Sequence, residues 1–371
     1  MIAIQDGLRG EAAMTQPRAR DRVRDRRIDQ LVALVTPGEM LEELPLGAEL
    51  EEVVLRGRNE VEAVLNQRDD RLLVVVGPCS VHDLEAARDY AARLAALAEE
   101  LRDDLCIAMR VYFEKPRTTT GWKGMINDPH LDDSGDVNAG LRIARGLLLD
   151  VLGLGLPVGC EFLDPIIPQY ISDAVAWGAI GARTTESQTH RQLASGLSMP
   201  VGFKNRTDGN VQVALDAVRA AAVPHAFTGV DETGRPAIVY TRGNLDCHVI
   251  LRGGKGAPNY PAEAVADVLA QLRAAHLPER LVIDASHDNS GKDHNRQPVA
   301  AADLAAQVAA GNRAIVGIML ESFLVAGRQE IGLTEGELAY GQSITDACMD
   351  WDTTVEVLAG LAEAVRTRRA G

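Results

Sequence analysis

Apolar residues along this chain alternate between short continuous runs and helical stripes. Leu72–Val76 is an unbroken apolar run that ends at Gly77-Pro78, which is typical of a strand buried on both faces. The next segment, Glu85–Leu101, spaces its leucines three and four residues apart and so predicts an amphipathic helix. Ile107–Phe113 then predicts a second strand. The pattern therefore indicates a strand, a helix and a strand in succession.

The same alternation continues to the end of the chain. Further strands are predicted at Val158–Leu163, Ala179–Arg183, Val201–Lys204, Val249–Arg252, Leu281–Ala285 and Ala314–Glu321. Helical stretches separate most of them, at Val137–Leu152, Pro168–Trp177, Val211–Ala221, Ala262–Ala275 and Asp303–Ala310. Strands that alternate with helices form a parallel sheet, and about eight such units close naturally as a TIM (β/α)8 barrel. The alternative is an open doubly wound sheet, but no GxGxxG motif follows the first strand.

Three segments extend this α/β barrel, which we place at residues 71–371. Residues 1–27 are polar and charged, and we expect a flexible arm. Residues 28–70 predict an N-terminal helical extension, with a first helix over Ile28–Val35 that stops at Pro37. Thr228–Thr241 predicts a β-hairpin within an insertion near 226–244. In the simplest interpretation, residues 1–27 are only a disordered tail and the hairpin only covers the barrel.

Charge and composition narrow the classes of function. The chain of 371 residues has a net charge of −15, which argues against nucleic acid or an anionic membrane as a partner. No stretch approaches the roughly 20 apolar residues that span a bilayer, and the Arg-rich start lacks the apolar core of a secretory signal. Five scattered cysteines without a CxxC motif indicate free thiols. We expect a cytoplasmic protein.

Charged side chains follow nearly every predicted strand. In a barrel the carboxyl ends of the strands converge on one axis, where active sites form. Buried cations are costly unless anions compensate them, and Arg and Lys are the residues that bind phosphate and carboxylate groups. The sequence therefore predicts a site for two anionic substrates, or for one substrate with several negative groups. The cations are Arg110, Lys115, Arg117, Arg183, Lys204 and Arg252.

A second set of polar residues combines a thiol, an imidazole and two carboxylates. Cys79, His287, Glu321 and Asp346 make a mixed soft and hard set, which suits a divalent ion such as Mn²⁺, Fe²⁺, Co²⁺ or Zn²⁺. These four residues are far apart in the sequence, so apart from their residue types only their positions near predicted strand ends support a shared metal site. Each also has an ordinary structural interpretation: Cys79 could be a core thiol, and Asp346 could cap a helix in Ser343-Ile-Thr-Asp.

Two segments at the first two predicted strands carry long motifs: Val76-Gly-Pro-Cys-Ser-Val-His-Asp83 and Met109-Arg-Val-Tyr-Phe-Glu-Lys-Pro-Arg-Thr118. Both closely resemble the type I 3-deoxy-D-arabino-heptulosonate-7-phosphate (DAHP) synthases. The resemblance covers roughly residues 28–365 in order. It departs at Arg206, which follows Asn205 where the family commonly has Gly, and in the variable segment 288–294. Further matching blocks are Gly121-Trp-Lys-Gly, Ile126-Asn-Asp-Pro-His, Glu161-Phe-Leu-Asp, Gly178-Ala-Ile-Gly-Ala-Arg-Thr-Thr-Glu-Ser187, Pro200-Val-Gly-Phe-Lys-Asn, Ile250-Leu-Arg-Gly-Gly-Lys, Asp284-Ala-Ser-His, Gly317-Ile-Met-Leu-Glu-Ser and Tyr340-Gly-Gln-Ser-Ile-Thr-Asp-Ala-Cys.

The resemblance implies a role for each candidate residue. One divalent metal ion would be held by Cys79, His287, Glu321 and Asp346. The phosphate of phosphoenolpyruvate would bind Arg183, Arg252 and the Ala182 backbone, its carboxylate Arg110 and Lys204, and Glu161 would act through water nearby. Arg117 and Thr118 would bind the phosphate of erythrose 4-phosphate, and Lys115 would lie between the two substrates.

The implied reaction condenses phosphoenolpyruvate with erythrose 4-phosphate and water, and it is the first step of the shikimate pathway. We expect Lys115 to protonate the developing alkoxide, with a pKa lowered by neighbouring cations; a metal-bound water is the competing donor. A synthase using arabinose 5-phosphate is the nearest alternative, and a sugar-phosphate-binding barrel without catalysis is another. In this family, additions such as residues 1–70 and the hairpin at 228–241 build subunit contacts and an aromatic amino-acid inhibitor site. The resemblance therefore also implies a homodimer or homotetramer with such an inhibitor.

Overall fold

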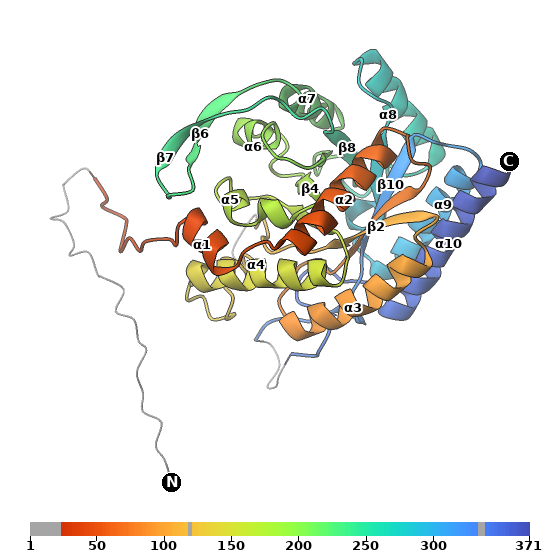
Figure 1. Ribbon diagram of the computed structural model, residues 1–371. Coiled ribbons are helices and arrows are strands. Elements are labelled where there is room, and N and C mark those ends of the chain that lie inside the picture. Colours follow the sequence, from red (N-terminus) through yellow and green to blue (C-terminus); the bar gives the residue numbers. More distant parts are fainter. Residues whose placement is uncertain (1–23, 118–120, 333–337) are drawn as a thin grey trace, which may run out of the picture. The chain divides into compact units, whose positions relative to one another are not determined.

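The computed structural model describes residues 24–117, 121–332 and 338–371 (Figure 1). Most of the predicted arm and the candidate residue Thr118 therefore lie outside the described residues. The chain divides after Val35 into two units. In the first unit, residues 24–35 contain no helix or strand. The second unit, from Thr36 to Gly371, contains every helix and strand described below.

Eight parallel strands of the second unit close into a barrel in the order β1-β10-β9-β8-β5-β4-β3-β2. Their side chains are almost all buried, because helices cover the outside of the barrel and inward-pointing side chains of the strands fill its inside. The predicted TIM barrel is confirmed, and the open sheet is wrong. The strands are β1 (Leu72–Gly77), β2 (Leu105–Arg110), β3 (Val158–Glu161), β4 (Trp177–Ile180), β5 (Val201–Lys204), β8 (His248–Leu251), β9 (Leu281–Asp284) and β10 (Ile315–Glu321).

The helices that follow these strands match the predicted ones in part. The stretch Pro168–Trp177 is helical only as far as Ala174, α9 (Gln297–Ala309) begins before the predicted Asp303, and α6 (Gln188–Ala194) lies where no helix was predicted. Aspartates cap several of them: the Asp83 side chain accepts the N–H of Ala86, and Asp350 accepts that of Thr353. The cap at Asp350 shows that the alternative role of Asp346 as a helix cap is wrong. The helices are α3 (Leu84–Glu100), α4 (Val137–Gly153), α5 (Pro168–Ile171), α6 (Gln188–Ala194), α7 (Gln212–Ala221), α8 (Ala262–Ala274), α9 (Gln297–Ala309) and α10 (Trp351–Ala370).

The N-terminal extension differs from the prediction in one respect. Ile28–Val35 is not helical, and Pro37 begins a helix instead of ending one. The reason is that proline suits the first helical position, where its missing N–H is not needed, and Thr36 and Glu39 form a capping box around it. The helices here are α1 (Pro37–Glu43) and α2 (Ala48–Leu65).

Helix α2 closes the amino-terminal end of the barrel. Val61, Val64 and Leu65 of α2 share one buried cluster with residues that begin strands, such as Cys106 and Trp177. Burial of these apolar side chains on both sides stabilises the contact. At the opposite, carboxyl end the strand ends converge on one axis, which is the end where barrels form their sites.

The predicted hairpin is confirmed as β6 (Ala226–Val230) paired antiparallel with β7 (Pro236–Tyr240). Its turn meets the start of α1, because the N–H of Gly38 donates to the carbonyl of Glu232 at 2.8 Å (Figure 1). A short pair of strands after the barrel, β11 (Val325–Arg328) and β12 (Gln342–Ser343), was not predicted.

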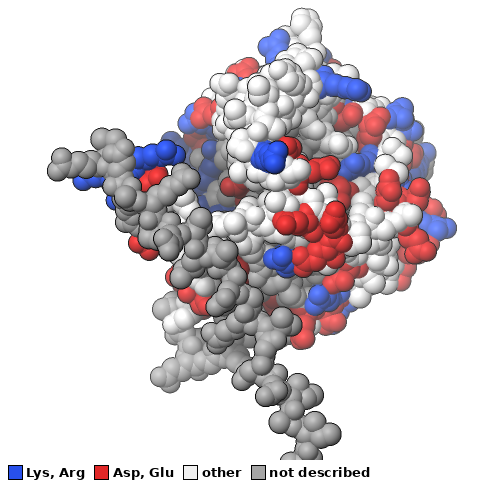
Figure 2. All heavy atoms as spheres, turned by 60° about the vertical axis from the view of Figure 1, so that its left-hand side comes forward, with Lys and Arg blue, Asp and Glu red and all other residues white. Residues whose placement is uncertain are grey.

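The surface carries both signs of charge. Figure 2 shows acidic side chains gathered near the middle of one face, with basic side chains scattered around them. Within the described part of the chain, every helix is too short or too polar to cross a membrane.

Candidate active site at the carboxyl end of the barrel

Three of the four predicted metal ligands converge at the carboxyl end of the barrel. Cys79 follows β1, Glu321 ends β10, and Asp346 lies in the loop before α10. One ligand atom from each lies within 4.8 Å of the other two. Ligands about 2.0–2.3 Å from one ion lie no more than about 4.6 Å apart, so the spacing fits a shared ion after small adjustment. The alternative role of Cys79 as a plain core thiol does not explain this grouping.

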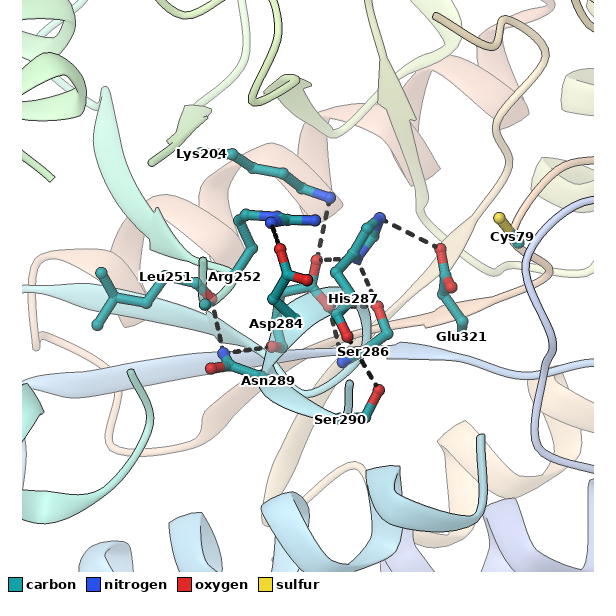
Figure 3. Close-up of polar contacts among 12 residues, drawn as sticks. Cys79, Lys204, Leu251, Arg252, Asp284, Ser286, His287, Asn289, Ser290 and Glu321 are labelled. Carbon is teal, nitrogen blue, oxygen red and sulfur yellow. Dashed lines mark hydrogen bonds and ion pairs between the residues drawn. The ribbon is translucent and has the colours of Figure 1, made fainter. Parts of the chain in front are cut away.

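The fourth predicted ligand, His287, lies beside this cluster. Its Nε2 atom is 3.8 Å from Oε1 of Glu321, while its Nδ1 atom is 2.8 Å from Oδ2 of Asp284 (Figure 3). The hydroxyl of Ser286 is also 2.7 Å from Nδ1. A carboxylate on one ring nitrogen leaves the other free to bind a metal, and it fixes the ring's orientation. The structure therefore groups three of the predicted ligands and places the fourth, His287, next to Glu321.

A buried arginine holds Glu321 in place. Nη2 of Arg110 lies 2.9 Å from Oε1 of Glu321, and both side chains are almost fully buried. Arg110 also donates to the carbonyls of Pro78 and Cys79, and its guanidinium lies 3.6 Å from the centre of the Tyr112 ring. A buried carboxylate is costly without such a partner. Arg110 therefore pairs with Glu321 and fixes the position of its carboxylate beside the cluster.

Lys115 contacts the thiol directly. Its Nζ atom lies 3.0 Å from Sγ of Cys79 and 2.8 Å from the Cys79 carbonyl oxygen. Burial acts to lower the pKa of Lys115, but attraction to Cys79, Glu321 and Glu161 raises it above the ordinary value despite repulsion from Arg110. The expected lowering of this pKa is therefore wrong, because attraction to Cys79, helped by Glu321 and Glu161, outweighs both burial and the repulsion from Arg110. Lys115 keeps its proton at neutral pH.

A cavity of about 160 Å³ opens beside the cluster. Predicted residues form most of its wall, while Cys79, Arg110 and Glu321 are buried. Four further residues of the wall were not predicted as site residues, because they share neither a position at the end of a strand nor a pattern of charge. They are Pro116, Thr207, Lys292 and Thr345. The lining residues are Lys115, Pro116, Arg117, Glu161, Ala182, Arg183, Lys204, Thr207, Arg252, His287, Lys292, Thr345 and Asp346.

Acidic residues hold two of the cavity's cations in place. Nζ of Lys204 lies 3.0 Å from Oδ2 of Asp284, and Arg252 forms an ion pair with Asp288. Asp284 thus contacts both Lys204 and His287. From the sequence, Asp284 is expected only to lie within the strand Leu281–Ala285, with no role in the site. Its position one turn before His287 was the available signal.

Buried side chains fix the loops that carry these groups. Glu114 accepts the backbone N–H groups of Leu163 and Asp164, directly after Glu161 in the chain. Asn205 accepts the N–H of Arg252 at 2.8 Å and so joins the ends of β5 and β8. Such buried hydrogen bonds are costly to break, and they hold the rim of the barrel rigid.

A larger cavity of about 820 Å³ lies at the opposite end of the barrel. Its charged residues already pair with one another, as in Arg71 with Asp69 at 2.7 Å and Arg369 with Asp70 at 2.6 Å. The smaller cavity is the better candidate site, because its cations adjoin the ligand cluster.

Comparison with known proteins agrees with this geometry. The sequence profile of the DAHP synthetase I family matches residues 49–359. The Phe-sensitive phospho-2-dehydro-3-deoxyheptonate aldolase of Escherichia coli (strain K12) is 56% identical over 346 residues, which cover 93% of this chain and 98% of that protein. The phospho-2-dehydro-3-deoxyheptonate aldolase of Corynebacterium glutamicum is 55% identical over 352 residues, 93% of this chain and 95% of that protein.

A solved structure shares the whole barrel. The phospho-2-dehydro-3-deoxyheptonate aldolase of Francisella tularensis SCHU S4 superposes with a TM-score of 0.90 at 49% identity, and the match covers 92% of this chain and 99% of that one. Sequence and structure therefore agree over nearly the full length of these relatives. This chain belongs to the DAHP synthetase I family.

Proposed function

We propose that this chain condenses phosphoenolpyruvate with D-erythrose 4-phosphate and water, giving 3-deoxy-D-arabino-heptulosonate 7-phosphate and phosphate. This reaction is the first step of the shikimate pathway. The observation that carries the proposal is the grouping of Cys79, Glu321 and Asp346 within 4.8 Å of one another, beside a cavity lined by lysines and arginines.

The proposed metal ligands are Cys79, His287, Glu321 and Asp346. A thiolate, an imidazole and two carboxylates form a donor set that suits Mn²⁺, Fe²⁺, Co²⁺ or Zn²⁺. When bound there, a divalent ion would polarise an aldehyde oxygen as a Lewis acid.

Phosphoenolpyruvate would occupy the cationic part of the cavity. Arg183, Arg252 and the backbone of Ala182 would bind its phosphate, and all three line the cavity. Arg110 and Lys204 would bind its carboxylate. Both of these side chains are buried, which strengthens their attraction for an anion that displaces water.

The aldose would lie on the side of Lys115. Arg117 lines the cavity, and its Nε donates to the Trp122 carbonyl at 2.7 Å, which orients the rest of the guanidinium. With Thr118, Arg117 would bind the phosphate of erythrose 4-phosphate. Glu161 would act through water near the enol phosphate.

The side chains then account for the proton transfers. C3 of phosphoenolpyruvate attacks the aldehyde carbon, and Lys115 donates a proton to the aldehyde oxygen as it becomes an alcohol. Water adds at C2 and releases one proton, which replaces the proton that Lys115 gave up. The resulting hemiketal phosphate then expels phosphate, and its hydroxyl proton leaves with the phosphate as the C2 keto group forms. The cations hold two anionic substrates within reacting distance, which offsets their repulsion and the loss of entropy.

An assay with the purified full-length protein tests this proposal. After metal is removed with a chelator, phosphate release from phosphoenolpyruvate should require both erythrose 4-phosphate and an added ion such as Mn²⁺. Cys79→Ala should lose bound metal and turnover. The control is Cys106→Ala, which removes a buried cysteine near the amino-terminal end of β2, away from the ligand cluster; this variant should keep both. Preference for arabinose 5-phosphate would show a different aldose specificity, and no consumption with any divalent metal would favour a barrel without catalysis.

Regulation is proposed from the relatives' names, and assembly from the family resemblance. The Escherichia coli relative is called Phe-sensitive, and a relative from Schizosaccharomyces pombe, 51% identical over 348 residues, is called tyrosine-inhibited. We expect one aromatic amino acid to inhibit this cytoplasmic enzyme, acting as a homodimer or homotetramer. Assays with Phe, Tyr and Trp one at a time would identify the inhibitor, and full activity with all three would contradict the proposal.

A further inference from the structure

Strand β10 extends beyond its neighbour β9 at the carboxyl end of the barrel. The last paired residues of these two strands are Met319 and Asp284, but β10 continues to Glu321. After Asp284 the chain leaves β9 and turns into a short 3-10 helix that begins at His287. On its other side, Glu321 still pairs with Gly77 of β1. The backbone N–H and C=O of Glu321 therefore face a place where no strand continues.

The side chain of Gln297 occupies that place. The N–H of Glu321 donates to Oε1 of Gln297 at 2.9 Å, and Nε2 of Gln297 donates to the carbonyl of Glu321 at 3.0 Å. The carbonyl also accepts the N–H of Met349 at 3.0 Å. Gln297 is 1% exposed. Its planar amide thus offers one donor and one acceptor to Glu321, as a peptide group of a neighbouring strand would.

This contact links two of the proposed metal ligands through one segment of chain. The segment that leaves β9 carries His287 and then returns to place Gln297 at the first position of α9. Gln297 holds the backbone of Glu321, while Arg110 holds its carboxylate at 2.9 Å. The distance of 3.8 Å between His287 and Glu321 therefore depends on a loop that is fixed at both ends.

We propose that Gln297 is a positioning residue for the metal site: it stands in for a missing strand neighbour and so holds Glu321 at the height where its carboxylate meets Cys79 and Asp346. The inference rests on the proposed metal-dependent function. Without the amide, the buried N–H of Glu321 loses its only acceptor among the described residues, and the end of β10 moves to find another. All four proposed metal ligands would then still be present, but the carboxylate of Glu321 would no longer lie in position to share an ion with the others.

Metal affinity of the folded apoprotein separates this role from a purely structural one. Gln297→Met keeps the length and volume of the side chain but removes both hydrogen bonds. We expect it to weaken Mn²⁺ binding about 10- to 100-fold, as loss of a supporting contact to a metal ligand does. Gln307→Met is the matched control. Gln307 lies on the same helix, and its side-chain amide also donates a hydrogen bond to a backbone carbonyl, that of Tyr260, far from the ligands. The control variant loses that hydrogen bond. This control should bind Mn²⁺ like the unchanged protein.

Mn²⁺ dissociation constants would be measured by electron paramagnetic resonance of the free ion, on samples shown to be folded by circular dichroism. A lower melting temperature for Gln297→Met with an unchanged Mn²⁺ dissociation constant would overturn the inference. If Gln297→Met does not fold, Gln297→Glu decides, because it keeps an acceptor for the N–H but sets a carboxylate oxygen against the carbonyl oxygen of Glu321 where the amide donated, and this repulsion displaces the end of β10. Its Mn²⁺ binding should also weaken, and normal binding would overturn the inference.

The unchanged protein distinguishes the two proposals. If it binds no divalent metal and makes no product, the proposed function fails. If it binds metal and turns over while both Gln297 variants bind Mn²⁺ equally well, only the role of Gln297 is wrong.

Discussion

The carboxylate of Asp284 lies 2.8 Å from Nδ1 of His287, and the same oxygen atom lies 3.0 Å from Nζ of Lys204. One buried acid therefore orients a proposed metal ligand and a proposed substrate-binding cation at once (Figure 3). Although burial acts to raise the pKa of Asp284, attraction to Lys204 and His287 and hydrogen bonds from His287 and Ser286 hold it well below its ordinary value. Asp284 is thus a charged anchor at the floor of the site.

Replacing this anchor by its uncharged isostere should damage both neighbours. Asp284→Asn is expected to weaken divalent-metal binding about 10- to 100-fold, because His287 loses its charged partner. It should also destabilise the fold by about 3–5 kcal/mol, because Lys204 is left buried without a counter-ion. Metal titration and urea unfolding would measure the two effects. Asp303→Asn, on the exposed side of α9, is the control; equal effects of both changes would contradict the assigned role.

Removing the ammonium of Lys115 should abolish the proton donor of the proposed reaction. Lys115→Met is expected to lower kcat about 100-fold or more at saturating metal, which is the usual contribution of a general acid. Since the pKa of Lys115 is raised, the unchanged enzyme should not lose this donor as pH rises through neutrality. The measurement is turnover at several pH values with metal content determined in parallel. Near-normal turnover of Lys115→Met would assign the proton to another group.

Gly181 leaves room for a carboxylate of the site. A Cβ atom at this position would lie 2.1 Å from Oε1 of Glu161, which is too close for any side chain. Gly181→Ala should therefore push Glu161 out of place and lower kcat/KM about 100-fold, the effect of roughly a 1 Å misplacement. Gly146→Ala is the control, because a Cβ there meets no atom within 4 Å. It should leave the kinetics unchanged and add about 0.5–1 kcal/mol of stability in α4.

A buried histidine predicts how stability depends on pH. The indole N–H of Trp177 donates to Nε2 of His248 at 3.2 Å, so the ring proton is on Nδ1, which donates to the carbonyl of Asp246. Burial lowers the pKa of His248 to about 3, despite the hydrogen bond to Asp246, which acts to raise it. Below about pH 6.5 the unfolded chain binds a proton at this residue that the folded protein does not bind.

The free energy of unfolding should therefore fall as pH drops from about 6.5 toward 3, with this residue alone removing about 2 kcal/mol by pH 5. His248→Gln keeps an acceptor for Trp177 but cannot titrate. Its stability should fall less steeply between pH 7 and pH 5, as measured by urea unfolding at each pH. Parallel curves for the two proteins would show that His248 is protonated in the folded state.

Much of this protein could be read from local pattern. The barrel strands are continuous apolar runs such as Leu72–Val76, because burial on both faces excludes polar residues, and each run ended where the structure ends a strand to within a few residues. The candidate residues are also placed by local rules, since parallel strands deliver whatever follows them to one rim. The error at Pro37 arose from the same kind of rule, because a proline that stops one helix can equally begin another.

The tertiary structure alone decided the distances and the supporting contacts. Nothing in the sequence shows that Asp284 contacts both Lys204 and His287, or that Gln297 completes the sheet beside Glu321. The reversed direction of the Lys115 pKa has the same origin, because its sign depends on which charges lie within a few ångströms. Apolar periodicity is a property of neighbours along the chain, and it suffices for a barrel. Electrostatics and hydrogen bonding depend on neighbours in space, which only the closed barrel brings together.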